Sequence, residues 1–314
     1  HFALGNLFRR RGEFDKSVRV HEHLIARADL SQADRDRAQY ALALDFLRAG
    51  LLDRAETALK KLTQSGLSMQ ADIALLAIFE RTRDWQQAKI VAQRLQQQGS
   101  GDFSVRQSHY LCEQAHGLIG KKQFSEAQQL LELAQTLAPQ HLRPKVEIAQ
   151  LYQTNEQHAK AFEILDLLLS THATAAPLVA MQYAQLSKHL GLCHHAQSNL
   201  EKIQEQQKCI DIAAALEWLA KEISNSNAIE KRDYYLAHLQ REPSLIAAGR
   251  WLLTHQDKME KPILEPICNA INKASKPLLK YRCASCGFEA QNHYWNCPGC
   301  QSWDSYPSKR IEEL

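Results

Sequence analysis

Residues 1–205 repeat one pattern of small and large apolar side chains. In each copy, a small or apolar residue is followed three positions later by an aromatic residue or leucine, and twelve positions later by another small residue. The copies are Gly5/Phe8/Ser17, Ala43/Phe46/Ala55/Leu59, Leu76/Phe79/Ala88, Ala115/Leu118/Ala127/Leu131, Ala149/Tyr152/Ala161/Leu165 and the partial copy Ala184/Ala196/Leu200. The second small residues of successive copies lie 38, 33, 39, 34 and 35 residues apart. A period of about 34 residues predicts pairs of helices in a repeating array.

Close packing explains why small side chains recur at fixed positions. A small residue on each helix lets the two backbones approach, and large residues fill the space between neighbouring pairs. One pair cannot bury its apolar face alone, so the pairs must stack. The turns carry glycine or polar residues, at Gly12, Gly50, Arg83-Asp84, Gly120, Asn155-Glu156 and Gly191. We therefore predict an all-α fold with about six tetratricopeptide-like pairs in residues 1–205, the first of them truncated.

The repeat pattern weakens after Ile203. Residues 210–222 and 228–240 predict a further, degenerate helix pair. Pro243-Ser244 opens another helix that runs to His255, and Pro262 and Pro266 punctuate a last helix near residues 263–274. We assign residues 206–275 to degenerate helical repeats.

Two CxxC motifs in residues 276–314 predict a metal-binding domain. They read Tyr281-Arg-Cys-Ala-Ser-Cys-Gly-Phe and Tyr294-Trp-Asn-Cys-Pro-Gly-Cys. Each motif places two thiolates on one turn, and two such turns form a tetrahedral four-sulfur site. The expected ligands are Cys283, Cys286, Cys297 and Cys300. Four protein ligands leave no open coordination position, so the ion is expected to be structural, and the spacing fits one iron or one zinc ion equally well.

The tail resembles a shortened rubredoxin-type ribbon. CxxCG matches the first turn and CPxC the second, but Gln301 stands where a glycine is usual and the loop between the turns has ten residues. A domain of this size gains much of its folding energy from the ion. Its aromatic residues are expected to form a small core or a face that docks onto the helices: Tyr281, Phe288, Tyr294, Trp295 and Trp303.

Two other functions are compatible with such a ribbon. The first is redox or metal sensing through iron in the sulfur site. The second is a scaffold associated with nucleic acid, but the tail lacks a basic face. Its five basic residues (Lys276, Lys280, Arg282, Lys309, Arg310) are matched by four acidic ones (Glu289, Asp304, Glu312, Glu313). Without that face the attraction to phosphate is missing, so we expect no nucleic acid among the partners.

Charge and motifs elsewhere indicate no catalysis. The 314 residues include 38 basic and 35 acidic side chains, a net charge of +3, with no block of one sign. The sequence has no GxGxxG, P-loop, GxSxG or HExxH motif, so we predict no catalytic residues and no enzyme. The remaining cysteines (Cys112, Cys193, Cys209, Cys268) are expected to be small buried side chains in a reducing compartment.

Helical register places one set of first-helix side chains on the concave side of the array. We predict that a protein or peptide partner binds there. The positions are Arg37, Tyr40, Glu80, His109, His116, Arg143, Gln150, Gln185 and Lys188. This surface is polar and of mixed sign, so it identifies neither the partner nor the oligomeric state, and a homo-oligomer stays open.

The whole chain resembles the lipopolysaccharide assembly protein B family of Gram-negative bacteria, which joins tetratricopeptide repeats to a C-terminal rubredoxin-like ribbon. The resemblance rests on Leu4-Gly5-Asn6-Leu7-Phe8-Arg9 with Arg11-Gly12-Glu13, and on the two cysteine motifs with Ser302 and Trp303. It implies a ribbon packed against the repeats. It also implies a non-enzymatic adaptor that promotes degradation of the lipid A-committing deacetylase by a membrane AAA+ protease and contacts other lipopolysaccharide assembly proteins.

The resemblance implies a place on the cytoplasmic side of the inner membrane. The anchor it implies is a transmembrane segment upstream of His1, where the printed sequence starts inside a helical pattern. We find no apolar run near 18 residues within the printed sequence itself.

Overall fold

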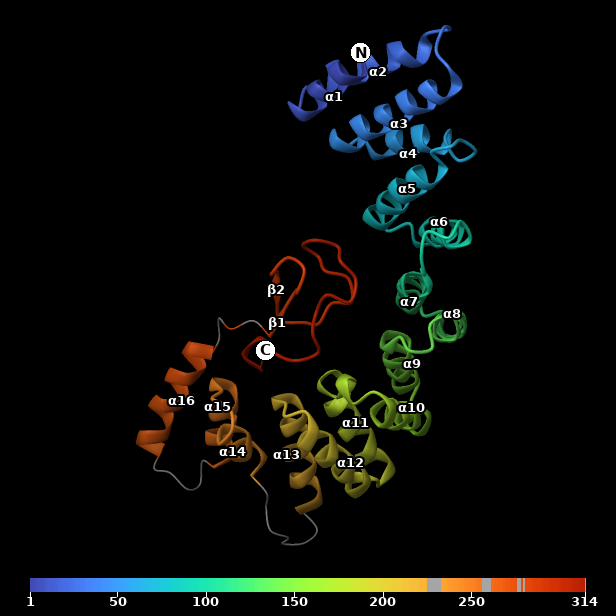
Figure 1. Cartoon of the computed structure of the whole chain (residues 1–314). Helices are drawn as coiled ribbons and strands as arrows, with labels where there is room; N and C mark the ends of the chain where they lie inside the picture. Colours follow the sequence, from blue (N-terminus) through green and yellow to red (C-terminus); the bar gives the residue numbers. More distant parts are fainter. Residues whose placement is uncertain (225–232, 256–260, 276–277, 279, 314) are drawn as a thin grey trace. The chain divides into compact units, whose positions relative to one another are not determined.

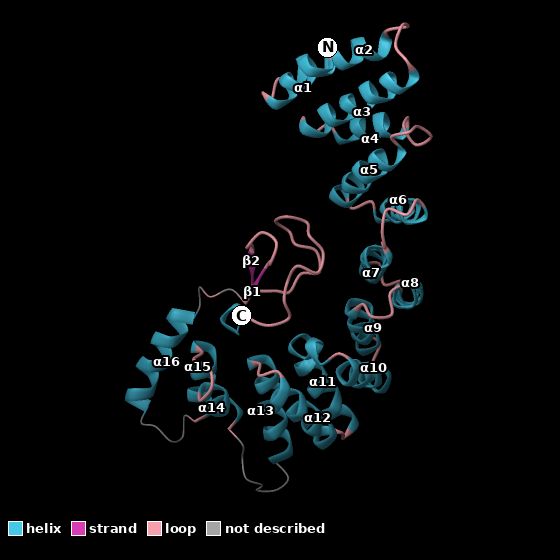
Figure 2. Ribbon diagram, in the orientation of Figure 1, coloured by secondary structure: helices cyan, strands magenta, loops and turns pink. Residues whose placement is uncertain are grey.

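The chain forms two compact units, His1–Pro139 and Gln140–Leu314, in a computed structural model (Figure 1). The structure describes residues 1–224, 233–255, 261–275, 278 and 280–313. Within these ranges the regular structure is helical apart from two short strands near the C-terminus (Figure 2). The division between the two units falls between the fourth and fifth predicted helix pairs. The domain boundaries predicted after residues 205 and 275 stay predictions.

The first unit consists of four helix pairs in sequence order. Their bounds are α1 Phe2–Arg10, α2 Phe14–Ala26, α3 Gln32–Arg48, α4 Leu52–Lys60, α5 Ser68–Thr82, α6 Trp85–Gln97, α7 Ser104–Gly120 and α8 Phe124–Leu137. Each second helix packs against the first helix of its own pair and, up to α6, against the first helix of the next pair. This is the stacking that the repeat pattern predicts.

The second unit continues with further helices and ends in the ribbon. The bounds are α9 Leu142–Thr154, α10 His158–Thr171, the 3₁₀ turn η1 Ala173–Ala175, α11 Ala176–Leu190, α12 Cys193–Gln206, α13 Ile210–Ser224, α14 Tyr234–Leu239, α15 Leu245–Thr254 and α16 Lys261–Ser275. The ribbon has β1 Tyr281–Arg282, β2 Glu289–Ala290 and the 3₁₀ turn η3 Ile311–Glu313. One apolar core runs from α9 through α14, with the fully buried Tyr183 near its middle.

The small residues of the repeat pattern are completely buried in the helix packing. All six second-helix positions (Ser17, Ala55, Ala88, Ala127, Ala161 and Ala196) have no exposed surface. A larger side chain at any of them would separate two backbones. The predicted helix pairs are therefore confirmed at the level of individual residues, and so is the all-α fold class.

The turns inside the pairs share a left-handed residue, but its identity varies. Glycine occupies this conformation in the first, second and sixth pairs, where Gly12, Gly50 and Gly191 have φ of 77°, 76° and 69°. In the third to fifth pairs the residues are Arg83, Lys122 and Glu156, with φ of 59°, 61° and 59°. The prediction that Gly120 forms the fourth turn is displaced by two residues, because Gly120 is still helical and Lys122 makes the left-handed turn.

Buried acidic residues in the first unit are held by arginines from other helices. Asp45 has no exposed side-chain surface, and Arg9 Nη1 lies 3.1 Å from its Oδ1. Asp72 is 2% exposed and accepts a hydrogen bond from Arg94 Nη2 at 2.5 Å. Both pairs connect different helices, so they fix which helices pack together as well as neutralising a buried charge.

The first helix pair contains a close contact that only glycine permits. A Cβ atom built on Gly5 would lie 2.4 Å from His21 Nε2. His21 is completely buried, and its Nδ1 lies 2.5 Å from Asp45 Oδ2. Ser17 Oγ donates to the Gly5 carbonyl at 2.8 Å. The small residue of α1 therefore makes room for a histidine that connects α2 to α3.

The degenerate helices follow the prediction where the structure describes them. The predicted helix at 210–222 is α13, and the helix after Pro243 is α15, capped by Ser244 Oγ, which accepts from the Ala247 amide at 3.0 Å. The predicted last helix is α16. Of the helix predicted at 228–240, residues 228–232 lie outside the described residues and α14 occupies 234–239.

Among the described residues, no single helix combines the length and the apolar composition for crossing a membrane. The segments His158–Thr171 and Ala173–Leu190 meet the two criteria only as a pair, with a bend of 120° between them.

Candidate metal centre

The two cysteine turns are built by the same backbone hydrogen bonds. In the first turn, the Gly287 amide donates to the Cys283 carbonyl and the Cys283 amide donates to the Phe288 carbonyl, both at 2.9 Å. These bonds curl the chain so that backbone amides point toward sulfur. Gly287 takes the left-handed conformation, with φ of 78°.

The second turn repeats this arrangement without a glycine. The Gln301 amide donates to the Cys297 carbonyl at 2.8 Å, and the Cys297 amide donates to the Ser302 carbonyl at 2.9 Å. Gln301 has φ of 61°, the counterpart of Gly287. The departure from the usual rubredoxin glycine therefore leaves the turn geometry intact, at a strain of about 1 kcal/mol for a side chain in this region.

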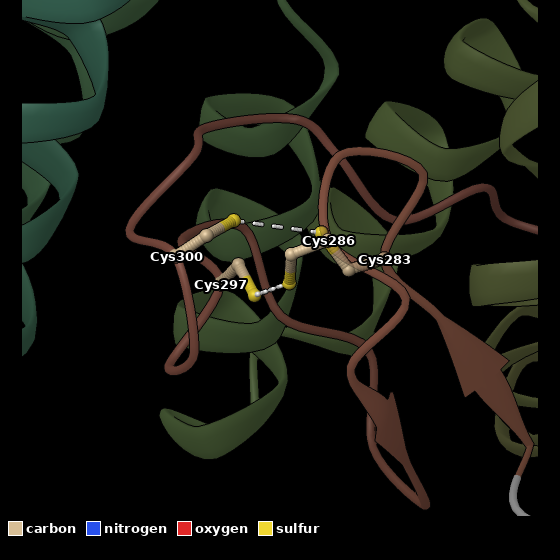
Figure 3. A group of neighbouring side chains, drawn as sticks. All are labelled: Cys283, Cys286, Cys297 and Cys300. Carbon is tan, nitrogen blue, oxygen red and sulfur yellow. Dashed lines mark hydrogen bonds between the residues drawn. The ribbon is translucent and has the colours of Figure 1, made fainter.

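The two turns face each other and bring four sulfur atoms together (Figure 3). Sγ of Cys283 lies 3.7 Å from Sγ of Cys300, and Sγ of Cys286 lies 3.7 Å from Sγ of Cys297. All four sulfurs lie within 4.8 Å of one another. A tetrahedral ion with metal–sulfur bonds of about 2.3 Å requires sulfurs about 3.8 Å apart. The predicted cysteines therefore fit a single iron or zinc ion.

Hydroxyl groups and amides beside two of the four sulfurs, those of Cys283 and Cys300, favour the thiolate form that binds metal. Ser305 Oγ donates to Cys283 Sγ at 3.2 Å. Burial raises the pKa of the Cys283 thiol, but this hydroxyl and the amides of Cys286 and Ser285 outweigh burial and lower the pKa to about 6. The Ser302 hydroxyl, 3.3 Å from Cys300 Sγ, lowers the pKa of Cys300. Thiolates are the metal-binding form, so these contacts prepare the site for an ion.

The ribbon has little regular structure of its own. Its two strands have two residues each, paired antiparallel with Tyr281 opposite Ala290. The buried core consists of Tyr281, Cys283, Ala290, Cys297 and Tyr306. Two of these five residues are expected metal ligands, so the ion stabilises the core directly.

The aromatic prediction for the ribbon is partly right. Tyr281 is buried, whereas Phe288 and Tyr294 are 44% and 40% exposed. The core instead contains Tyr306 and, beside it, His293, whose ring centroid lies 4.7 Å from that of Trp295. A neutral His293 donates from Nε2 to the Tyr306 carbonyl at 3.2 Å. Tyr306 was missed because nothing local distinguishes it from an exposed tyrosine.

The ribbon docks on helices of its own unit. Leu178 of α11 packs against the ribbon core. Ser308 Oγ donates to the Thr174 carbonyl in η1 at 2.8 Å. His141, just before α9, has its ring centroid 6.4 Å from that of Trp295. The packing of ribbon on repeats that the family resemblance implied is thus present within the second unit.

Charged residues before the first strand of the ribbon and after its second cysteine turn attach the ribbon to the start of α13. Arg310 donates to Asp211 from Nε at 3.1 Å and from Nη2 at 2.8 Å. Lys280 Nζ lies 3.1 Å from the same carboxylate. Glu313 Oε1 accepts from the Ile210 amide at 2.6 Å. Of the ribbon charges counted in the sequence, Lys276 lies outside the described residues.

The arrangement of four sulfurs determines what an ion can do here. A bound ion would serve as a structural link or, if it were iron, as a one-electron centre. Four cysteine ligands leave no position for a substrate or a water nucleophile. Cys283 and Cys297 are buried while Cys286 and Cys300 are exposed, so one side of the centre faces solvent.

The other cysteines divide into two groups. Cys112 and Cys209 are completely buried, as predicted for small core side chains. Cys193 and Cys268 are half-buried.

Several residues predicted for a partner groove are exposed. Arg37 lies in the first unit, with its side chain 72% exposed and 3.7 Å from Asp34. Tyr40 is half-buried and His116 is exposed in the same unit. In the second unit the exposed predicted residues are Gln150, Gln185 and Lys188, and Lys188 pairs with Glu222 at 2.7 Å.

Two other predicted groove residues are buried and a third is half-buried, contrary to the expectation that they face a partner. His109 has no exposed surface. Arg143 is 3% exposed, and its Nε donates to Glu147 Oε1 at 2.6 Å. Glu80 has a side chain 10% exposed and accepts two hydrogen bonds from Arg106. Helical register gave the face of each residue, but Glu80 is covered by Arg106, 26 residues away in the sequence, and Arg143 pairs with Glu147 within its own helix.

Comparisons with known proteins give one match to the ribbon and others along almost the whole chain. The family model Zn_ribbon_LapB, described as "Rubredoxin metal binding domain", matches residues 281–306. Lipopolysaccharide assembly protein B of Escherichia coli K12 is 28% identical over 310 residues, which cover 97% of this chain and 79% of that protein. The protein of the same name from Haemophilus influenzae is 25% identical over 308 residues, covering 96% of this chain and 77% of that protein.

Solved structures that resemble the chain include repeat proteins. A tetratricopeptide repeat protein from Parabacteroides merdae is 13% identical, with a TM-score of 0.35, and covers 75% of this chain and 98% of that one. The C-terminal part of a repeat protein from Cytophaga hutchinsonii is 14% identical, with a TM-score of 0.40, and covers 84% and 98%. The sequence relatives confirm the resemblance to the lipopolysaccharide assembly protein B family along almost the whole chain.

Proposed function

Because the chain resembles lipopolysaccharide assembly protein B along 97% of its length, we propose that it is a non-enzymatic scaffold in lipopolysaccharide assembly. That match, which includes both the helical array and the ribbon, is the observation that carries the proposal. The four-sulfur centre supports a scaffold over an enzyme, because it offers no coordination position to a substrate.

The scaffold acts as a proteolysis adaptor in this proposal. It brings the deacetylase that commits a precursor to lipid A to a membrane AAA+ protease, and it contacts other lipopolysaccharide assembly proteins. It works on the cytoplasmic side of the inner membrane. The basis for this mechanism is the family resemblance, and the stacked helix pairs supply the extended surface that such an adaptor needs.

Exposed first-helix residues are the proposed contact points for these partners. Gln150, Gln185 and Lys188 supply donors and acceptors from the second unit, and Arg37 and His116 supply them from the first. Their mixed polarity fits transient contacts, because polar surfaces tolerate solvent when the partner leaves.

The half-life of the deacetylase in cells tests the adaptor mechanism. We expect depletion of this protein to lengthen the half-life, and wild-type protein to restore it. Cys297→Ser should fail to restore it, because the ribbon loses a ligand. Cys112→Ser alters a buried cysteine outside the centre and should restore it. An unchanged half-life on depletion would reject the adaptor mechanism.

A further inference from the structure

The last residues of the ribbon form a continuous connection between the sulfur centre and α13. Ser305 Oγ donates to Cys283 Sγ at 3.2 Å, and the Ala284 amide donates to the Ser305 carbonyl at 2.7 Å. Five residues further on, Arg310 binds Asp211 of α13 through two hydrogen bonds. We call residues 305–313 the C-terminal latch.

The latch covers the N-terminus of α13. Glu313 Oε1 accepts from the Ile210 amide at 2.6 Å, and Glu313 Oε2 lies 3.4 Å from Cys209 Sγ. A carboxylate at this end of a helix is favourable, because the first amides lack partners within the helix. Cys209 has no exposed surface while the latch is in place.

Both ends of the latch depend on the ribbon fold. Tyr306 belongs to the ribbon core, and its hydroxyl donates to the Phe288 carbonyl at 3.2 Å and lies 3.9 Å from Cys297 Sγ. The Ile311 amide donates to the Lys280 carbonyl at 3.0 Å, next to β1. A ribbon with two two-residue strands cannot keep these positions without an ion at its sulfurs.

We propose that metal occupancy of the four-cysteine centre controls the latch, so that loss of the ion uncovers the start of α13 and the Cys209 thiol. With the ion bound, the latch holds Glu313 at α13 and excludes solvent from Cys209. When the ion leaves, residues 305–313 detach and residues 209–211 at the start of α13 become accessible to solvent. This coupling is intramolecular and does not depend on the adaptor mechanism.

Maleimide labelling of Cys209 in the whole chain is the direct test. The protein is compared as loaded with metal and after removal of the ion by a chelator under reducing conditions. Peptide mass mapping separates Cys209 from the four ribbon cysteines, which also become reactive. Burial and the nearby carboxylates of Glu313 and Asp211 raise the pKa of Cys209 to about 12, so the closed state labels slowly. We expect at least a tenfold faster labelling of Cys209 without metal.

Two variants separate latch opening from other effects. Arg310→Ala breaks the latch and leaves all four ligands in place, so it should expose Cys209 while the metal content stays at one ion per chain. Arg282→Ala removes a ribbon ion pair with Glu289 in which both side chains are exposed, and it should leave Cys209 protected.

Two results would overturn the proposal. One is a metal-free protein in which Cys209 stays as protected as in the loaded form, while Arg310→Ala labels rapidly. The other is equal acceleration at Cys112, which is buried in the first unit, because that would indicate general unfolding in place of a local opening.

Discussion

Arg310 holds Asp211 with two hydrogen bonds, at 3.1 and 2.8 Å, across 99 residues of sequence. Their side chains are only 10% and 14% exposed. Removing Asp211 would leave the largely buried Arg310 charge without both of these bonds, which costs more than the pair contributes. Removing Arg310 would leave Asp211 with Lys280, whose Nζ lies 3.1 Å from its carboxylate. This pair is therefore the strongest single attachment that we identify between the ribbon and the helical array.

We expect Arg310→Ala to lower the free energy of unfolding of the ribbon–α13 region by about 2 kcal/mol, since a hydrogen-bonded charged group is lost. Hydrogen exchange of the amides at residues 210–213 measures this local stability. The matched control is Arg282→Ala, whose exposed ion pair contributes below about 1 kcal/mol. Equal effects of the two variants would contradict the assigned role of Arg310.

Gly5→Ala should destabilise the first helix pair by about 1–3 kcal/mol, because the new Cβ would overlap the buried His21 ring and displace it from Asp45. Urea denaturation followed by circular dichroism gives the change. Gly117→Ala is the control, since its Cβ meets no atom within 4 Å. In that helix the added methyl should stabilise the protein by about 0.5–1 kcal/mol. The Gly5 contact would be refuted by a neutral Gly5→Ala.

Arg83→Gly should stabilise the third helix pair by about 0.5 kcal/mol, because glycine adopts the left-handed conformation without a steric cost. The opposite change at the sixth pair, Gly191→Ala, should cost about 1 kcal/mol. Thermal melts of both variants, read beside the wild type, check the two signs. Destabilisation by Arg83→Gly would show that the arginine side chain contributes more than its backbone costs.

His293 makes the ribbon sensitive to mild acid. Burial lowers the pKa of His293 below its ordinary value of 6.5, although its hydrogen bond to Tyr306 acts in the opposite direction. The unfolded chain therefore binds a proton more readily than the folded chain. Stability from the neutral ring is complete above pH ~6.5 and is lost as pH falls through the lower folded pKa, by at most about 1.4 kcal/mol per pH unit.

The variant His293→Phe keeps a ring and cannot titrate, so its stability should fall less between pH 7 and 5. Urea midpoints measured between pH 7 and 5 for the wild type and the variant give the difference in stability. The other histidines are the same in both proteins, so their effects cancel in this difference. Parallel curves would exclude His293 as the group responsible.

Removal of the ion should disorder the ribbon and leave the helices folded. We expect the near-ultraviolet circular dichroism of Trp295 and Trp303 to collapse on chelation, while the far-ultraviolet helical signal changes little. Cys286→Ser should give the same spectrum without chelator. Metal analysis of protein from native cells distinguishes zinc from iron. An apo-protein with an unchanged aromatic signal would show that the ribbon folds without its ion.

Local sequence patterns were sufficient for most of the array and for the cysteine centre. Ala88 and Ala161 could be assigned to a helix–helix contact because the repeat pattern relates residues twelve positions apart. The four sulfurs could be grouped because the two cysteines of each CxxC turn are three positions apart. In both cases the determining residues lie within twelve positions of one another or on one CxxC turn.

Contacts between segments far apart in the sequence could not be predicted from the local pattern of residues. The Arg310–Asp211 pair spans 99 residues, and nothing near either residue marks the other. The same limit applies to the groove: Glu80 was assigned to the concave face of a helix, yet it accepts two hydrogen bonds from Arg106, 26 residues away in the sequence. The fourth turn was misplaced for a different reason, because Lys122 adopts a conformation that composition alone assigns to glycine.

The histidine contact at the start of the array limits how its repeats can be rearranged. His21 fits only beside a helix without a side chain at the position of Gly5, and it needs the carboxylate that α3 supplies through Asp45. A chimera that moved α1 and α2 in front of α5 or α7 would bury His21 without that acceptor. Engineers who shorten or recombine this array must therefore transfer α1, α2 and α3 together as one block.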